Sequence, residues 1–162
     1  MLRVCIGVTK GDERLSEWFT LPISEEEFSE RLGVSFSGEY SIIDYEAPFD
    51  IKEDTSIEIL NDMDSKYEEI ISWLPQIVAD SVLKNNFRSI DKLLGSMYEV
   101  RYYPDCHTSK DLAYQYIEER GGLQGYEDYR EIYRYFDFEA FGRDMIKYGS
   151  YLFCDYGAIY VE

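Results

Sequence analysis

The amino-acid sequence predicts an α+β fold, with strands near both ends of the chain and helices in the middle. Hydrophobic residues make up 45% of the 162 residues and aromatic residues 17%, which is enough to bury a core. Apolar side chains alternate with a period of two near the ends, whereas the middle has a period of about 3.6. We therefore expect three small subdomains: an N-terminal α/β part (1–60), a central helical part (61–103) and a C-terminal α/β part (104–162).

A β-hairpin is predicted to open the chain. Apolar residues alternate along residues 2–9 and share one face of the strand: Leu2, Val4, Ile6 and Val8. The sequence Lys-Gly-Asp at 10–12 is typical of a turn, and a second strand is expected over residues 15–21.

A short acidic helix and a third strand are expected next. Ser24 followed by Glu27 matches a capping box, and Gly33 is typical of the residue that ends a helix. These signals predict a helix over residues 25–32. Residues 40–45 then have the pattern of a strand.

From Ser56 onward the apolar period changes to that of a helix. One stripe ends before Pro75 and comprises Ile57, Leu60, Met63 or Asp64, Tyr67, Ile70, Ile71 and Leu74. Further helices are expected over residues 76–85 and 89–98, with a break at Asn85-Asn86. A strand over residues 99–103 completes the middle of the chain.

The C-terminal part is predicted to begin with two helices. Thr108 or Ser109 can cap a helix that runs to Arg120, because Gly121 follows as a stop signal. Residues 126–134 are expected to form another helix.

A third helix and a hairpin are predicted to end the chain. The helix covers residues 137–148 and stops at Gly149. Its apolar stripe comprises Phe138, Phe141, Met145 and Tyr148. Strands over residues 151–155 and 158–161 are expected to be joined at Tyr156-Gly157.

The chain is strongly acidic, with 33 Asp and Glu against 16 Lys and Arg and a formal charge of −17 at pH 7. The acids concentrate at the two ends, since the three subdomains carry −9, −2 and −6 in chain order. Such a charge repels nucleic acids and anionic membranes, and it favours basic protein surfaces as partners. The alternative is that the charge only keeps the protein soluble.

The sequence is expected to belong to a soluble, cytoplasmic protein. The apolar run at residues 4–8 is shorter than the roughly 7 to 15 residues of a signal peptide's apolar region. No segment approaches the roughly 20 apolar residues that span a bilayer. The cysteines, Cys5, Cys106 and Cys154, are odd in number and far apart, unlike a disulfide framework.

Residues that could support catalysis or metal binding form no recognisable motif. The single histidine, His107, follows Asp105 and Cys106, but no second histidine or cysteine lies at ligand spacing. No nucleophile-elbow sequence accompanies it, and the abundance of carboxylates makes any one pair uninformative. We therefore expect no enzymatic activity, no metal and no cofactor, and we place His107 in a loop.

A glycine-rich segment at 121–125, Gly-Gly-Leu-Gln-Gly, superficially resembles a phosphate-binding loop. It follows a predicted helix rather than a strand, lacks the lysine of a P-loop, and lies between Glu118-Glu119 and Glu127-Asp128. Because those carboxylates repel phosphate, we interpret the segment as a turn that ends the helix.

Two series of acidic residues form the candidate interaction surface. The first comprises Glu25, Glu26, Glu30, Asp44, Glu46, Asp50, Glu53, Asp54 and Glu58. The second comprises Glu118, Glu119, Glu127, Asp128 and Glu131. Carboxylates on rigid elements could imitate DNA phosphates, which place one negative charge per roughly 1.7 Å of duplex axis. The alternative is that both series are ordinary solvated faces.

Three segments carry a resemblance to a known family. They are Trp-Phe-Thr-Leu-Pro-Ile at 18–23, Ile-Asp-Tyr-Glu-Ala-Pro-Phe at 43–49, and Tyr-Phe-Asp-Phe-Glu-Ala-Phe-Gly-Arg-Asp-Met at 135–145. In these segments and in their spacing, the chain resembles the ArdA antirestriction proteins of plasmids and conjugative transposons. Phe136 and Phe138 depart from the family motif, which commonly reads Ile-Asp-Tyr; the exchanges keep bulk and lose a hydroxyl.

The resemblance implies an elongated, three-part protein that pairs as a curved homodimer and mimics bent B-form DNA. It implies that the dimer occupies the DNA-binding groove of a type I restriction-modification enzyme, formed by the specificity subunit and the methyltransferase core. Inhibition would then proceed by decoy, without catalysis. The alternative is an acidic inhibitor of another basic partner, such as a nucleoid protein or a toxin.

The third segment matches the family's antirestriction motif, which lies near the dimer interface. The residues carried over are Tyr135, Phe136, Asp137, Phe138, Glu139, Phe141, Arg143, Asp144 and Met145. The resemblance gives Phe138 and Phe141 a packing role. The charged members, Asp137, Glu139, Arg143 and Asp144, would orient or charge the junction.

Overall fold

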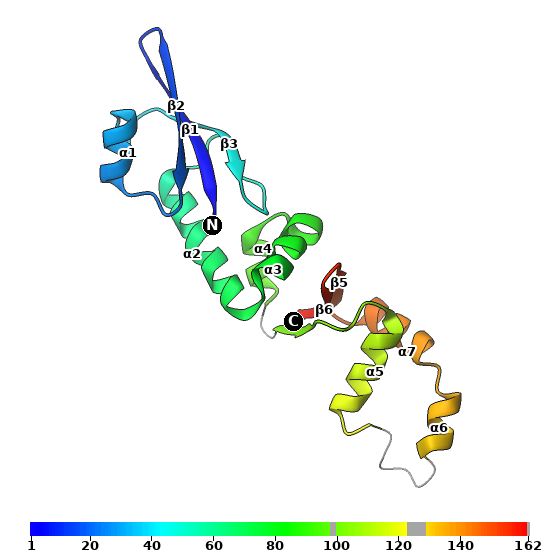
Figure 1. Ribbon diagram of the computed structural model, residues 1–162. Helices are drawn as coiled ribbons and strands as arrows, with labels where there is room; N and C mark the ends of the chain where they lie inside the picture. Colours follow the sequence, from blue (N-terminus) through cyan, green and yellow to red (C-terminus); the bar gives the residue numbers. More distant parts are fainter. Residues whose placement is uncertain (98–99, 123–128, 162) are drawn as a thin grey trace. The chain divides into compact units, whose positions relative to one another are not determined.

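The computed structural model describes residues 1–97, 100–122 and 129–161, without the side chains of Lys10, Tyr129 and Arg130. The chain divides into two compact units, Met1–Leu94 and Gly95–Glu162. Each unit combines helices with a small antiparallel sheet, so the predicted α+β class is confirmed (Figure 1). The division into three subdomains stays a prediction.

The first unit contains a three-stranded sheet in the order β2-β1-β3. Its strands are β1 (Arg3–Lys10), β2 (Glu13–Thr20) and β3 (Ser41–Glu46). The apolar face predicted for the first strand is buried, and it comprises Leu2, Val4, Ile6 and Val8. The predicted hairpin and third strand are therefore confirmed.

Helix α1 (Glu25–Leu32) begins and ends where its capping signals predict. The backbone N–H of Glu27 donates to Ser24 Oγ at 3.2 Å, which satisfies one of the free donors of the first turn. Gly33 adopts φ 63°, a left-handed conformation that glycine reaches without steric cost. Phe28 is buried with its ring centroid 5.7 Å from that of Phe19, so α1 packs against β2.

The helices predicted for the middle of the chain lie in the first unit up to Leu94, whereas the strand predicted after them belongs to the second unit. They comprise α2 (Ile57–Trp73), α3 (Gln76–Val82), the π-helical segment η1 (Leu83–Phe87) and α4 (Ile90–Gly95). The α2 stripe buries Asp64 rather than Met63, which resolves the alternative that the period left open. The break predicted at Asn85-Asn86 is wrong, because a bond from Arg88 N–H to Leu83 O at 2.7 Å continues the helix as a π turn.

The second unit contains a sheet in the order β4-β6-β5. Its strands are β4 (Val100–Tyr103), β5 (Tyr151–Cys154) and β6 (Gly157–Val161). The hairpin turn lies at 155–156, one residue earlier than expected. Gly157 opens β6 with φ 131°, and a Cβ there would lie 2.3 Å from Tyr103 O, so this position needs glycine.

Three helices complete the second unit: α5 (Ser109–Glu119), α6 (Tyr129–Tyr135) and α7 (Phe138–Tyr148). Thr108 rather than Ser109 caps α5, and its partner in the capping box is Asp111. Helices α5 and α7 pack closely at Gly142, where a Cβ would lie 1.8 Å from Ser109 O. Within the described part of the chain, no helix has the length and apolar character to cross a membrane.

Candidate functional site

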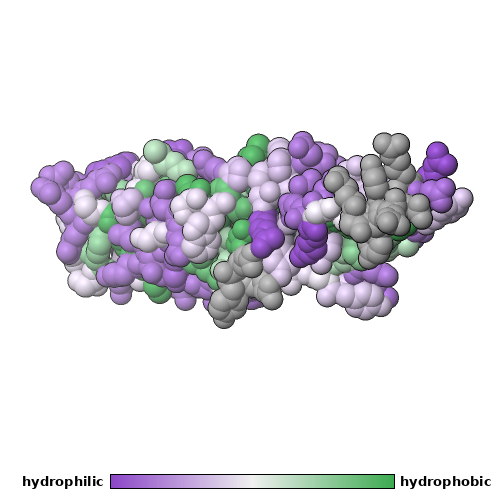
Figure 2. Space-filling model, turned by 90° about the horizontal axis from the view of Figure 1, so that it is seen from below, coloured by the Kyte–Doolittle hydropathy of each residue, from purple (hydrophilic) through white to green (hydrophobic). Residues whose placement is uncertain are grey.

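The first acidic series lies on consecutive elements of the first unit, and every member is exposed. Its members follow one another along α1, β3, the loop 47–56 and the first turn of α2: Glu25, Glu26, Glu30, Asp44, Glu46, Asp50, Glu53, Asp54 and Glu58. Acids in the first turn of a helix interact favourably with its dipole, so α1 gains stability from them. In one view of the surface, hydrophilic residues cover much of the visible face (Figure 2).

The acids of the loop 47–56 lie on a backbone that is held in place. Phe49 and Ile51 are buried, at 3% and 7% exposure, and anchor the loop to the core. Ile42 N–H donates to Glu53 O at 2.8 Å, and Asp50 N–H donates to Arg88 O at 3.1 Å. Because these anchors fix the backbone between the acids, the loop presents its carboxylates from defined positions.

One member of the first series is paired within the unit. Arg3 Nη1 lies 2.9 Å from Glu46 Oε2, across the β1–β3 pair of strands. Both side chains are exposed, so the pair contributes little to stability. The Glu46 charge is therefore partly offset by the neighbouring guanidinium.

The described members of the second acidic series lie on helices α5 and α6 of the second unit. These members, Glu118, Glu119 and Glu131, are exposed, whereas Glu127 and Asp128 lie outside the described residues. The Tyr133 hydroxyl donates to Glu118, and this bond raises the pKa of Tyr133 to about 12. The Glu118 carboxylate is thus held by an aromatic neighbour rather than pointing freely into solvent.

The segment 135–145 forms the junction between α6 and α7. Asp137 caps α7, because its Oδ1 accepts from Ala140 N–H at 2.9 Å. Phe138 is buried, and its ring centroid lies 4.7 Å from that of Phe136. Phe141 also contacts Phe136, at a centroid distance of 5.5 Å. The aromatic members thus pack against one another within the unit.

The charged members of this segment are exposed. Arg143 Nη1 forms an ion pair with Glu139 Oε1 at 2.8 Å, one turn apart on α7. Asp144 is exposed and Met145 is half-buried. Tyr135 is 87% exposed. The role of this segment at a dimer interface stays a prediction.

The structure places Asp105, Cys106 and His107 in the loop before α5, as predicted for the histidine. Burial raises the pKa of the Cys106 thiol to about 11, so the sulfur stays protonated at neutral pH and is a poor nucleophile or ligand. His107 is exposed. Among the residues that the structure describes, no group of three or more His, Cys, Asp and Glu could hold a metal ion.

The described part of the glycine-rich segment ends α5. Gly121 N–H donates to Glu118 O at 3.0 Å, and Gly122 N–H donates to Ile117 O at 2.9 Å. Both glycines have positive φ, 91° and 64°, a conformation common in the residues that follow a helix. The predicted turn is confirmed for these two residues, while 123–125 lie outside the described residues.

Sequence reasoning missed a cavity of about 550 Å³ in the second unit. Arg101, Arg120 and several tyrosines line it, together with motif members Phe141, Asp144 and Met145. One sequence feature pointed toward this cavity: Arg101 and Tyr103 lie two residues apart on a predicted strand, and such side chains share one face of the strand. Which residues of β5 and β6 lie beside Arg101 and Tyr103 depends on strand register, and the sequence pattern does not specify the register.

Comparison with known proteins assigns the chain to a family. The model of the antirestriction protein family ArdA matches residues 11–160. No curated protein matches the chain significantly. The family match covers both units and includes the acidic series as well as the 135–145 segment. The chain therefore belongs to the ArdA family of antirestriction proteins, whose members act against restriction enzymes.

Proposed function

We propose that this protein inhibits type I restriction-modification enzymes by mimicking bent B-form DNA and occupying their DNA-binding groove. The groove is the surface that the specificity subunit and the methyltransferase core present to DNA. Such a groove is basic because it must neutralise phosphates, so an acidic protein surface can compete for the same side chains. The protein acts in this account as a homodimer in the cytoplasm and performs no catalysis.

The observation that carries the proposal is the fixed and exposed position of the first acidic series. Asp44 and Glu46 lie two residues apart on β3, which corresponds to about 6.8 Å along a strand. Two nucleotide steps along one DNA strand also advance about 6.8 Å. Glu26 and Glu30 lie one helical turn apart on α1, or about 6 Å. Carboxylates carried on a strand and a helix at such backbone spacings support mimicry better than charges on an unfolded tail.

Binding in this account is mainly electrostatic. Two chains together carry a formal charge of −34, since each carries −17. Long-range attraction to a basic groove and the contacts of exposed carboxylates with Lys and Arg are both screened by salt. Inhibition should therefore weaken steeply as ionic strength rises.

A DNA cleavage assay with a purified type I enzyme tests the proposal. Added in stoichiometric excess at low salt, the protein should abolish cleavage and release labelled target DNA from the enzyme. If DNA binding and cleavage are unchanged, the proposal is wrong. A pull-down from host lysate that retains a nucleoid protein or a toxin, and no restriction enzyme, would favour the alternative acidic-inhibitor function.

A further inference from the structure

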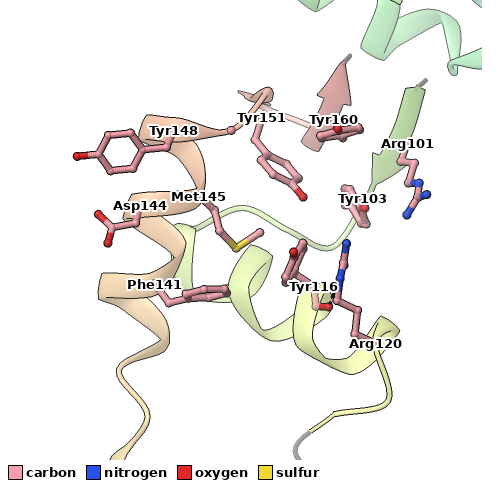
Figure 3. A pocket seen from close by; sticks show the side chains of 11 residues that line it. Arg101, Tyr103, Tyr116, Arg120, Phe141, Asp144, Met145, Tyr148, Tyr151 and Tyr160 are labelled. Atoms are coloured by element: carbon pink, nitrogen blue, oxygen red, sulfur yellow. Dashed lines mark hydrogen bonds between the residues drawn. The ribbon is translucent and has the colours of Figure 1, made fainter. Parts of the chain in front are cut away.

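We propose that the second unit binds a small planar aromatic anion in the cavity between its sheet and helices α5 and α7. The cavity measures about 550 Å³, within the roughly 300 to 1,000 Å³ typical of small-ligand sites. Rings and guanidinium groups from the sheet and from both helices surround it (Figure 3). The cavity shares Phe141, Asp144 and Met145 with the 135–145 segment but includes no member of either acidic series, so its ligand binding can be tested separately from DNA mimicry.

The sheet supplies one wall of the cavity through a row of side chains across its three strands. Arg101 on β4 lies opposite Tyr160 on β6, and Tyr160 lies opposite Tyr151 on β5. Directly opposed residues share one face of a sheet, and Tyr103, two residues after Arg101, lies on that face as well. The ring centroids of Tyr151 and Tyr160 are 5.1 Å apart, so the wall offers contiguous aromatic surface for a planar ligand.

Helix α5 supplies a second wall and a positioned cation. The Arg120 guanidinium carbon lies 3.6 Å from the centroid of the Tyr116 ring, and Arg120 Nη1 donates to Tyr116 O at 3.4 Å. These contacts hold the guanidinium before any ligand arrives, which lowers the entropy cost of binding. Figure 3 shows Arg101 and Arg120 on the same side of the cavity, with Asp144 on the opposite side.

The two arginines favour an anion at their end of the cavity. A guanidinium has five N–H donors, so each arginine can contact a tyrosine and a ligand oxygen together. The nearby Glu119 does not line the cavity, and its carboxylate accepts from Gln115 at 3.2 Å and from Tyr103 at 3.4 Å. The lining at this end thus contains two guanidinium groups, and Asp144, the one acidic residue among the described residues of the lining, lies on the opposite side (Figure 3).

The middle of the cavity favours an aromatic group. Phe141 and Met145 of α7 face the tyrosine wall in Figure 3 and make that part of the lining apolar. The Tyr151 hydroxyl is uncharged at neutral pH, as for any tyrosine, and burial raises its pKa further, to about 12, so it does not repel an anion. A lysine or arginine side chain from a basic partner would be repelled by the two guanidinium groups.

Titration calorimetry at low salt tests the proposal with four probes: 5′-AMP, indole-3-acetate, adenosine and inorganic phosphate. The first two combine a planar ring with an anion and distinguish a nucleotide from an aromatic carboxylate as the source. At least one should bind with a Kd below about 1 mM, at least tenfold tighter than adenosine or phosphate. Absence of binding by both aromatic anions overturns the proposal.

Substitutions assign the binding to this cavity. Arg120→Gln and Arg101→Gln should each weaken binding at least fivefold, whereas the matched change Arg134→Gln on α6, outside the cavity lining, should leave it unchanged. Amide shifts of the wild-type protein on adding the bound probe should centre on β4, β6 and α5, which keeps the test valid if a variant misfolds. Shifts elsewhere overturn the proposal. Sedimentation gives a further test. If both arginine variants disrupt a dimer while ligand binding persists, a second copy of the chain covers the cavity, and the proposal is wrong.

Discussion

The two units of the molecule differ in formal charge and in aromatic content. The first holds 20 acidic and nine basic residues, a formal charge of −11, and three of the 16 tyrosines. The second carries −6 from 13 acidic and seven basic residues, and it holds the other 13 tyrosines within 68 residues. The first unit thus places charge on the surface of a largely aliphatic core, whereas the second builds its packing and its cavity from rings.

This difference separates two kinds of recognition. A field from many exposed carboxylates acts over a distance, and each group contributes little. A cavity of rings and guanidinium groups acts only at contact and depends on a few residues. If the two units behave as distinctly as their compositions suggest, a change in one unit should leave the other unaffected.

Gly142→Ala should destabilise the second unit by about 3 kcal/mol, because the new Cβ would lie 1.8 Å from Ser109 O and force α5 and α7 apart. Urea unfolding measures the effect by two signals. Both tryptophans, Trp18 and Trp73, lie in the first unit, so their emission reports on that unit, while tyrosine near-UV circular dichroism reports mainly on the second.

Only the tyrosine transition should move to lower urea in this variant. Gly95→Ala is the matched control, because a Cβ at Gly95 has no neighbour within 4 Å. Equal displacement of both transitions would show that the two units unfold together and do not differ in their free energy of unfolding as independent parts.

Removing three charges from the first unit should weaken antirestriction more than removing three from the second. The variant Glu53→Gln, Asp54→Asn and Glu58→Gln should raise the half-inhibitory concentration roughly tenfold, about 1.4 kcal/mol in total. Its counterpart changes Glu118, Glu119 and Glu131 to Gln and should have a smaller effect, since tyrosines already engage Glu118 and Glu119. Equal losses would contradict a leading role for the first unit.

Thr108→Ala should cost the second unit about 1 kcal/mol, because it removes the cap of α5. Hydrogen bonds from Thr108 lower the pKa of Asp111 in the folded state below the unfolded value of 3.8. The resulting stability is present above pH 4 and is lost as pH falls through the lowered pKa. Tyrosine-detected unfolding between pH 7 and pH 3 should therefore show a weaker acid dependence in the variant, and an unchanged acid dependence would refute this assignment.

Asp64→Asn should raise the free energy of unfolding of the first unit at neutral pH. The gain should be smaller than the loss that Thr108→Ala causes in the second unit. Burial, followed by the charge of Glu68, raises the pKa of Asp64 above its unfolded value of 3.8. The ionised carboxyl therefore reduces stability at pH values above its raised pKa, and this cost disappears on acidification. Tryptophan-detected melting at pH 7 and pH 4 measures the effect, and a variant less stable at pH 7 would show that Asp64 makes a needed contact.

A single change of Glu30→Gln should have the smallest effect, less than twofold on inhibition, because one exposed charge contributes little to a collective field. Dose–response curves at fixed low salt measure it. A loss above tenfold from this one substitution would indicate a specific contact rather than a distributed surface.

Local signals in the sequence predict much of the fold. Ser24, Glu27 and Gly33 place the ends of α1 correctly, because caps depend on neighbours within one turn. The choice between Met63 and Asp64 on α2 could not be made, since both fit the helical period and the packed neighbours decide burial. The break at Asn85-Asn86 was misplaced for a similar reason, because a π turn absorbs the asparagines.

The candidate sites also differ in how far the sequence predicts them. Exposure of the acidic series follows from residue type, so those positions could be chosen from the sequence. The cavity could not be predicted, because the row of Arg101, Tyr160 and Tyr151 exists only through strand register. Which acids face a partner depends on a complex and not on the chain alone.

The central claim is that the acidic surface and DNA compete for one groove. The most direct measurement is the apparent inhibition constant of the wild-type protein against a type I enzyme, determined by displacement of labelled DNA over a range of DNA concentrations. Competition predicts that this constant rises in proportion to the DNA concentration and rises again with salt. A constant independent of DNA concentration would mean that inhibitor and DNA bind together, and it would contradict DNA mimicry.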